Sequence, residues 1–408
     1  MHRPIFAIAL SVALEASGEE LRRPDLVGPP FPLQPSLLAE ADYRAYPSEL
    51  EGNTGFALGR LRPGLVLHPT PWFLGVVAVE LAREHPEVLD AFARFRPLPW
   101  VEFSGGYSRP PMFGSFYDPV HIMPFPDLSP VVNAFRVRRD LGVDVHVAPR
   151  TVPIDAWIRL GNGTGSPLGN DNALPALYLA ADLVLGRTWT GNRDGRTFGL
   201  RLGASTLIES SRDRDGITGT TPLGFVYYRP NVVSGLRVVS DVHFIGVAGP
   251  VRATFEGAYA HESRSRDDDG NPATPRTDLP AIKSYGLTAE LAWTLLGRPR
   301  EVARAPQATQ GPWRGGALEL AARFDRLWLG RGANDVVAGG TRGCAVAVKW
   351  WPAAFLSTTL AAYTQRYDTA PIEEPNNRWS WGLIARASFF WGLPAQLQRP
   401  LSQPETTP

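Results

Sequence analysis

Residue patterns that carry enzymatic or metal chemistry are scarce in this sequence. Gly161–Gly165 lacks the spacing of a dinucleotide-binding loop and leads into no expected helix, so we interpret it as a flexible hairpin loop. Asp267–Asn271 lacks the flanking helices of a calcium-binding hand, and Pro272 stands where that loop needs glycine. His261 and Glu262 have no second histidine in register, and no Gly-x-Ser-x-Gly elbow occurs. We therefore expect no catalytic residue, no metal site and no cofactor.

The charged residues point instead to electrostatics. The chain has 41 Lys and Arg against 40 Asp and Glu, a net charge of +1, and its only lysines are Lys283 and Lys349. Such a balance gives no polyanion-binding surface, so we expect no nucleic-acid partner. A single cysteine, Cys344, excludes a disulfide within the chain and a paired-thiol metal site.

The two ends of the chain differ from the middle. An apolar run, Ile5–Leu14, follows His2 and Arg3 and predicts a signal peptide over 1–18; an ordinary apolar N-terminus is the alternative, and Glu15 is atypical of a signal. Residues 19–36 form a Pro-rich lead-in, and 392–408 form a disordered tail. No run approaches the ~18 apolar residues of a membrane helix.

Between the ends, segments of about 10 residues alternate with period two, the signature of strands that cross a bilayer at a tilt. In the last segment, Asn377–Trp391, one face carries tryptophan and phenylalanine at both ends with small apolar residues between them. This arrangement matches an aromatic girdle around a lipid-facing band. In Ala134–Val147, Arg136 and Arg138 fall on the polar face, although a soluble sandwich strand would also alternate.

Counting these segments predicts an all-β fold, a 16-stranded antiparallel transmembrane β-barrel over 37–391. An even number of strands is expected if both ends of the chain lie in the periplasm. Successive connections then alternate between the two sides of the membrane, which makes the periplasmic turns mostly short and the external loops mostly long. The expected strands are 37–47, 54–67, 72–83, 88–96, 99–107, 135–147, 153–161, 174–187, 196–209, 235–246, 250–263, 283–296, 313–329, 341–351, 354–367 and 377–391.

One expected external loop, 108–134, has 27 residues, six prolines and several aromatic residues. A loop of this length and composition does not float free of the protein. We expect it to fold into the barrel and constrict the pore, while a packed surface loop is the alternative.

Short motifs in order over residues 55–391 resemble the phosphate-selective porin O and P family. They include a paired-arginine strand, an Asp-Ala-aromatic strand, a Pro-x-Phe-Gly turn and an Arg-Asp-x-Gly-Val strand. The motifs stand at Gly59–Arg62, Asp90–Phe95, Pro111–Gly114, Arg139–Val143, Asn162–Gly163 with Asn170–Asn172, Leu287–Glu290, and Gly316–Leu320 with Arg323–Asp325.

The resemblance implies a trimeric 16-stranded barrel whose third external loop constricts the pore and which passes anions, classically phosphate or polyphosphate. Two features depart from it. The family's phosphate-selective members have a lysine-rich lumen, which this chain lacks, and the expected inner faces here mix charges of both signs, which focuses little net field.

We therefore expect an outer-membrane porin of a Gram-negative-type bacterium that passes small hydrophilic solutes with a bias toward anions. Its expected partners are outer-membrane lipid and lipopolysaccharide, small anions such as phosphate, and two further copies in a homotrimer. Two alternatives stay open: a structural or adhesive barrel with an occluded lumen, and a soluble all-β carbohydrate-active enzyme. The expected constriction contacts are Arg60, Arg62, Arg109, Arg136 and Arg138.

Overall fold

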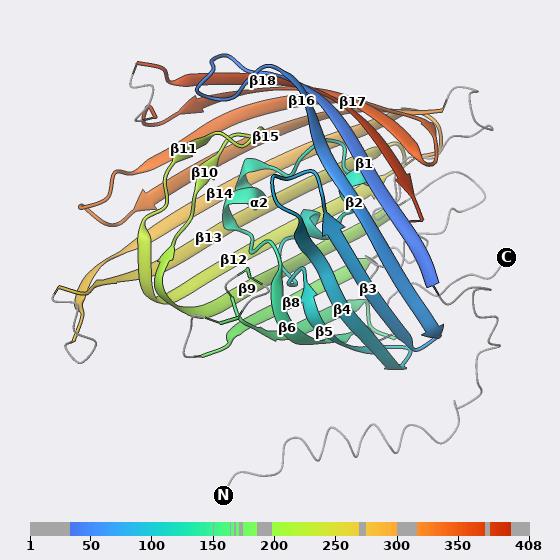
Figure 1. Cartoon of the computed structure of the whole chain (residues 1–408), viewed down its shortest axis with the longest axis horizontal. Coiled ribbons are helices and arrows are strands. Elements are labelled where there is room, and N and C mark those ends of the chain that lie inside the picture. Colours follow the sequence, from blue (N-terminus) through green and yellow to red (C-terminus); the bar gives the residue numbers. More distant parts are fainter. Residues whose placement is uncertain are drawn as a thin grey trace, which may run out of the picture.

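A computed structural model gives the structure of the chain (Figure 1). It describes residues 33–149, 151–163, 165–166, 169–170, 174–185, 198–268, 275–299, 316–371 and 376–392. The expected signal peptide, most of the lead-in and residues 393–408 of the tail lie outside these ranges. Within them, no helix is long and apolar enough to cross a membrane.

Sixteen strands form one closed antiparallel barrel, as the sequence predicts, and each strand pairs with its neighbours in the chain. The ring closes where the first strand pairs with the last. The barrel strands are β1 (Leu33–Ala45), β2 (Gly55–Thr70), β3 (Phe73–Glu80), β4 (Glu87–Leu98), β5 (Val101–Ser108), β6 (Asp140–Val147), β7 (Ile154–Gly161), β8 (Ala176–Leu185), β9 (Phe198–Asp215), β12 (Val232–Ala248), β13 (Val251–Arg266), β14 (Thr277–Leu296), β15 (Ala317–Arg331), β16 (Gly339–Ala353), β17 (Leu356–Tyr367) and β18 (Trp379–Trp391).

The alternation seen in the sequence sorts the side chains between the two faces of the wall. In β13, Phe255 is exposed on the outside, whereas Arg252, Thr254 and Glu256 are buried. In β18, Trp379, Trp381 and Phe389 are exposed, and Arg386 is buried. The exposed outer face is thus apolar and the inner face polar, the reverse of a soluble protein. A soluble carbohydrate-active enzyme would need these outer faces buried.

Most connections show the predicted contrast between the two ends of the barrel, but 186–197 and 297–316 are long connections at the end with the short turns. At the end where β1 begins and β18 ends, β2 joins β3 through 71–72, β4 joins β5 through 99–100, and β12 joins β13 through 249–250. At the other end, longer segments include 109–139 and 216–231. The second of these holds a small hairpin of β10 (Gly219–Thr220) and β11 (Val226–Tyr228).

Segment 109–139 contains three short helical elements: η1 (Ser115–Tyr117), η2 (Val120–Ile122) and α2 (Pro130–Phe135). The prediction that 135–147 is one strand is therefore wrong at its start, because β6 begins only at Asp140. Ser129 caps α2 by accepting a hydrogen bond from Val132 N at 3.0 Å, and Pro130 occupies the first turn. Both features favour a helix over a strand. At the N-terminal end, β1 begins at Leu33, four residues before the expected start of the barrel.

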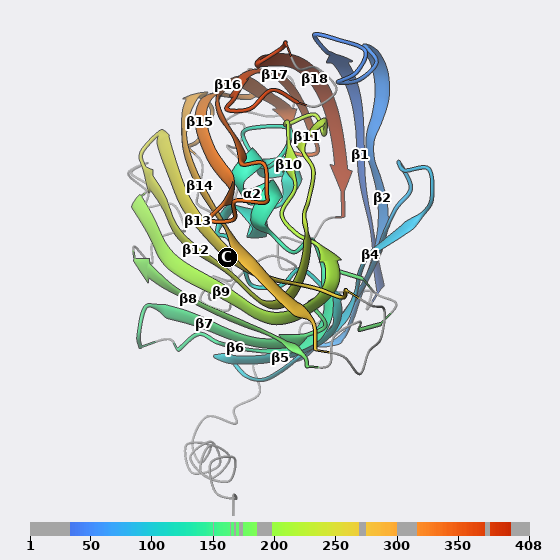
Figure 2. The same cartoon turned by 90° about the vertical axis from the view of Figure 1, so that its left-hand side faces the viewer.

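Strand length varies around the barrel. On one side β3, β5, β6 and β7 have 8 residues each. On the opposite side β12, β13 and β14 have 17, 16 and 20 residues. We call β3–β7 the short wall and β12–β18 the long wall. Figure 2 shows the long strands curving around α2, which lies within the ring.

Candidate functional site: arginines of the inner wall and of segment 109–139

The inner wall is lined by charged side chains of both signs, and most of those described are paired. Arg201 of β9 binds Asp182 of β8, Arg237 of β12 binds Glu209 of β9, and Arg159 of β7 binds Asp144 of β6. Because most of these positive charges on the wall lie beside negative ones, the wall produces little net electrostatic field. Any local excess of charge must then lie where this pairing stops.

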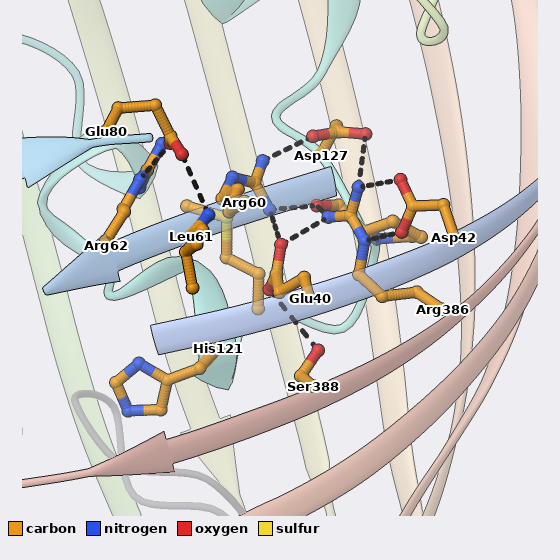
Figure 3. A network of polar contacts seen from close by, with 12 residues as sticks. Glu40, Asp42, Arg60, Leu61, Arg62, Glu80, His121, Asp127, Arg386 and Ser388 are labelled. Atoms are coloured by element: carbon orange, nitrogen blue, oxygen red, sulfur yellow. Dashed lines mark hydrogen bonds and ion pairs between the residues drawn. The ribbon is translucent and has the colours of Figure 1, made fainter. Parts of the chain in front are cut away.

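The densest group of ion pairs joins the first and last strands (Figure 3). Arg386 of β18 contacts Asp42 through Nε at 2.7 Å and through Nη2 at 2.9 Å, and its Nη1 lies 3.1 Å from Glu40. Arg60 of β2 also binds Glu40, and its Nη2 donates to Asp127 at 2.5 Å. We call Glu40, Asp42, Arg60, Asp127 and Arg386 the seam cluster, because it closes the barrel.

Segment 109–139 contributes to the seam cluster through Asp127 and crosses to other strands as well. The backbone N–H of Ser115 donates to Glu256 of β13 at 2.8 Å, and that of Phe113 donates to Asp241 of β12 at 3.0 Å. Farther along, Lys349 of β16 donates to the carbonyl oxygens of His121 at 2.8 Å and Met123 at 2.7 Å.

Asp118 of the same segment accepts from Arg252 of β13, and Pro126 O accepts from Arg386 of β18. These contacts hold one continuous segment against inward-facing side chains of several strands.

Helix α2 packs against β13, β14 and β15 with a glycine beneath it. A Cβ on Gly286 of β14 would lie 2.6 Å from Val131 Cγ1 and 3.1 Å from the ring of Phe135. Both of these side chains are fully buried. Only glycine therefore allows α2 to approach the wall so closely.

Of the five arginines expected at a constriction, two belong to the wall and are neutralised. Arg60 is shared between Glu40 and Asp127, and Arg62 donates to Glu80 through Nε at 2.6 Å. Both point inward from β2, as Figure 3 shows. Both are held by carboxylates, which neutralise their charge.

The other three, Arg109, Arg136 and Arg138, lie in segment 109–139. The prediction that Arg136 and Arg138 belong to a strand wall is wrong, because the chain leaves α2 at Arg136 and pairs again only at Asp140. Within the described part of the chain, none of the three forms an ion pair with a carboxylate. Arg138 is exposed.

Arg109 and Arg136 meet at one aromatic ring. Their Cζ atoms lie 5.1 and 4.7 Å from the centroid of Phe116, a distance at which a cation is attracted to the face of a ring. Arg109 also donates to Phe116 O at 2.7 Å, and Arg136 donates to Asn133 Oδ1 at 2.8 Å. The buried Nε of Arg136 has no hydrogen-bond partner.

The pKa values show that these charges repel one another. Burial, followed by the charges of Arg139 and Arg62, lowers the pKa of Arg109 to about 9. Burial also lowers the pKa of Arg136 well below its ordinary value, followed by the charges of Arg138 and Arg109. We call Arg109, Arg136 and Arg138 the loop arginines. Together they form a local excess of positive charge.

Sequence reasoning missed two residues of this region. Arg139 alternates with the apolar residues of Ala134–Val147 and so appears in the sequence to share their face, but it is buried and its Nε donates to Asp90 of β4 at 3.1 Å. Lys349 points inward and donates to two backbone carbonyl oxygens of segment 109–139. A pattern of side chains in the sequence does not reveal such backbone acceptors. Among the residues that the structure describes, no group of three His, Cys, Asp or Glu is arranged to hold a metal ion.

Comparison with known proteins supports the fold but assigns the chain to no family. No protein-family model matches the chain, so the resemblance to the phosphate-selective porins is not confirmed, and no curated protein matches it in sequence. Solved structures with the same fold include the trimer form of the outer-membrane protein OmpT of Vibrio cholerae, at 10% identity and a TM-score of 0.56. That match covers 88% of this chain and 99% of OmpT.

An anion-selective porin from Comamonas acidovorans is similar at 8% identity and a TM-score of 0.55, covering 88% of this chain and 99% of that porin. The outer-membrane channel DcaP of Acinetobacter baumannii is similar at 12% identity and a TM-score of 0.54, covering 88% and 96% of the two chains. The chain thus has the fold of the outer-membrane porins.

Proposed function

We propose that this protein is an outer-membrane porin that passes small hydrophilic solutes passively and favours anions. The fold supports this, because sixteen strands enclose a lumen wider than their own side chains fill. The apolar outer face supports a place in lipid, since a closed barrel is the one strand architecture that leaves no unpaired edge in hydrocarbon. No covalent chemistry is part of the proposal.

The observation that carries the anion preference is the contrast between the wall and the loop arginines. Wall arginines such as Arg60, Arg62 and Arg386 are neutralised by carboxylates. Arg109, Arg136 and Arg138 have no such partner within the described residues. At an effective dielectric constant of about 20, a unit charge about 6 Å away attracts an anion by roughly 3 kcal/mol before salt screens it. We propose that segment 109–139 narrows the pore and brings passing ions within that range.

Reversal potential in planar lipid bilayers under a salt gradient tests this proposal. The double variant R109Q/R136Q keeps polar side chains but removes two charges, so its anion-to-cation permeability ratio should fall several-fold while conductance persists. The control R83Q/R266Q removes two exposed arginines that are paired with Glu87 and Asp268. The control should behave as wild type. An unchanged reversal potential in R109Q/R136Q would show that the loop arginines do not set selectivity.

We propose that phosphate is one of the permeating anions and that it is not held tightly. The guanidinium fork of arginine suits phosphate geometry. The chain lacks a lysine-rich lumen that would draw anions in from a distance, since one of its two lysines, Lys349, is occupied with backbone carbonyls. The anion preference should therefore weaken steeply as ionic strength rises and the screening length shortens.

We propose further that the short wall is the interface of a homotrimer. A strand tilted by about 45° needs roughly 9–11 residues to cross a bilayer. The 8-residue strands β5, β6 and β7 are too short, whereas the strands of the long wall are not. Contact with neighbouring subunits would cover the short wall without thinning the membrane around it. Exposed apolar residues such as Val143 and Ile158 lie on this face.

A second candidate function, a barrel with an occluded lumen that serves as a scaffold, is favoured by one observation. Inward-facing charged residues such as Asp182, Glu256 and Glu319 are almost fully buried, although water in an open channel would reach them. The same bilayer recording separates the two functions. A reconstituted barrel that conducts no ions at any voltage would establish the scaffold in place of the pore.

A further inference from the structure

The outer face of the long wall carries a row of arginines near the end with the long loops. Arg326 of β15 stands directly opposite Arg342 of β16, and Arg342 stands directly opposite Arg366 of β17. Trp379 of β18 continues the row opposite Arg366. Residues directly opposite one another point to the same face of a sheet, and Arg342 and Trp379 are exposed on the outside. We call Arg326, Arg342 and Arg366 the arginine row.

Like charges directly opposite one another destabilise a sheet unless a counter-charge is present. Arg326 has one, since its Nη1 and Nη2 donate to Asp368 at 2.8 and 3.1 Å. Arg342 and Arg366 form no ion pair with any carboxylate in the part of the chain that the structure describes. Among the described residues, the middle and the far end of the row are therefore charges without an internal partner.

Aromatic rings and two further cations surround the row. The Cζ of Arg366 lies 5.7 Å from the ring centroid of Trp379, and the Cζ of Arg326 lies 4.7 Å from that of Trp328. Exposed tryptophans on the outside of a barrel mark the level at which hydrocarbon meets the headgroups. Beyond them, Lys283 stands opposite Arg331, whose Nη2 lies 3.6 Å from Asp368. The row thus lies at the headgroup level, with Lys283 as a further cation farther from the hydrocarbon.

We propose that the arginine row binds the phosphate groups of lipopolysaccharide in the outer leaflet. Arginine presents a planar fork of donors that fits phosphate, and its apolar stem can lie along the barrel while its charge reaches the headgroups. The end with the long loops faces outward if the termini are periplasmic, which places the row in the leaflet that holds this phosphorylated lipid. A second copy presenting the same row would be repelled by it.

The inference rests on the proposed place of the barrel in the outer membrane, and it does not require the barrel to conduct. A bilayer that shows no conductance would remove the pore and leave the lipid site intact. Loss of the lipid site would in turn leave the pore unaffected, because the arginine row and the loop arginines lie on opposite faces of the wall.

Binding of purified lipopolysaccharide to the full-length protein in detergent tests the proposal. The variant R342Q/R366Q should bind about 25-fold more weakly, at about fivefold for each cation lost near an anionic lipid surface. R342K/R366K keeps the charge without the fork and should fall between this variant and wild type. The control R96Q/R298Q removes two exposed arginines at the opposite end of the barrel and should bind as wild type.

Three results would overturn the proposal. The first is equal affinity of R342Q/R366Q and R96Q/R298Q. The second is undiminished binding of chemically dephosphorylated lipopolysaccharide, which would assign the contact to the acyl chains or the sugars. The third is a change of oligomeric state in R342Q/R366Q by native mass spectrometry, which would make the row a subunit interface.

Discussion

Arg386 provides the sharpest test of how the barrel is held closed. Its side chain is 4% exposed and contacts Asp42, Glu40 and Pro126 O in the seam cluster. Replacing it by glutamine leaves two buried carboxylates with less compensation. Breaking a buried ion pair in this way costs about 3–5 kcal/mol, because the remaining charge cannot return to water.

Urea unfolding in lipid vesicles, followed by tryptophan fluorescence, measures this cost. At an m-value of about 3 kcal/mol/M, the expected loss lowers the midpoint by about 1–1.7 M. R386Q/D42N should recover part of the loss, since the second change removes a buried carboxylate that keeps only Arg44 as its partner. The exposed Arg378 gives a matched control, R378Q, with a shift below about 0.5 kcal/mol. A loss below about 1 kcal/mol in R386Q would refute the view that the seam cluster holds the ends together.

Three further outcomes follow from the structure. V346R, on the long wall, should lose about 2–4 kcal/mol of folding free energy in lipid vesicles. V143R, on the short wall, should instead shift the oligomer toward monomer in native mass spectrometry. Equal behaviour of the two variants would contradict the assignment of the walls. G286V should displace α2 and change single-channel conductance, with a stability cost of about 1–3 kcal/mol, and wild-type conductance would show that α2 does not border the ion path. Burial raises the pKa of Asp127, but Arg386 and Arg60 outweigh it and lower the pKa to about 2. The stability that this carboxylate contributes is therefore present above about pH 4 and is lost toward pH 2. D127N should lack that component of the pH dependence of unfolding.

The barrel was predictable because its physical cause is local. Alternation along each strand separates lipid-facing from lumen-facing residues, and a shift of one position would reverse every side chain. The expected facing therefore holds in strands such as β13 and β18, where Phe255 and Trp381 are exposed and Glu256 and Arg386 are buried. The number of strands and the contrast between short turns and long loops follow from the same pattern.

Segment 109–139 was harder to predict because its partners are distant in the chain. Alternation continued from β6 backward through Arg136, so it suggested one long strand. Ser129 and Pro130 are local sequence signals that predict the start of helix α2. The pairing of Arg139 with Asp90, and that of Arg386 with Asp42, depends on which strands become neighbours, which no local pattern encodes.

The seam between β1 and β18 also bears on how the barrel assembles. Leu37 pairs with Trp391 and Ala45 pairs with Leu383, so hydrogen bonds across the seam join residues at opposite ends of the sequence. These are contacts of the highest sequence separation in the fold, and closing so long a loop delays their formation. A chain that ends before β18 would present β1 and β17 as open edges, ready to pair with another chain. Arrival of the last strand therefore both completes the wall and delivers Arg386 to the carboxylates of β1, which couples barrel closure to synthesis of the whole chain.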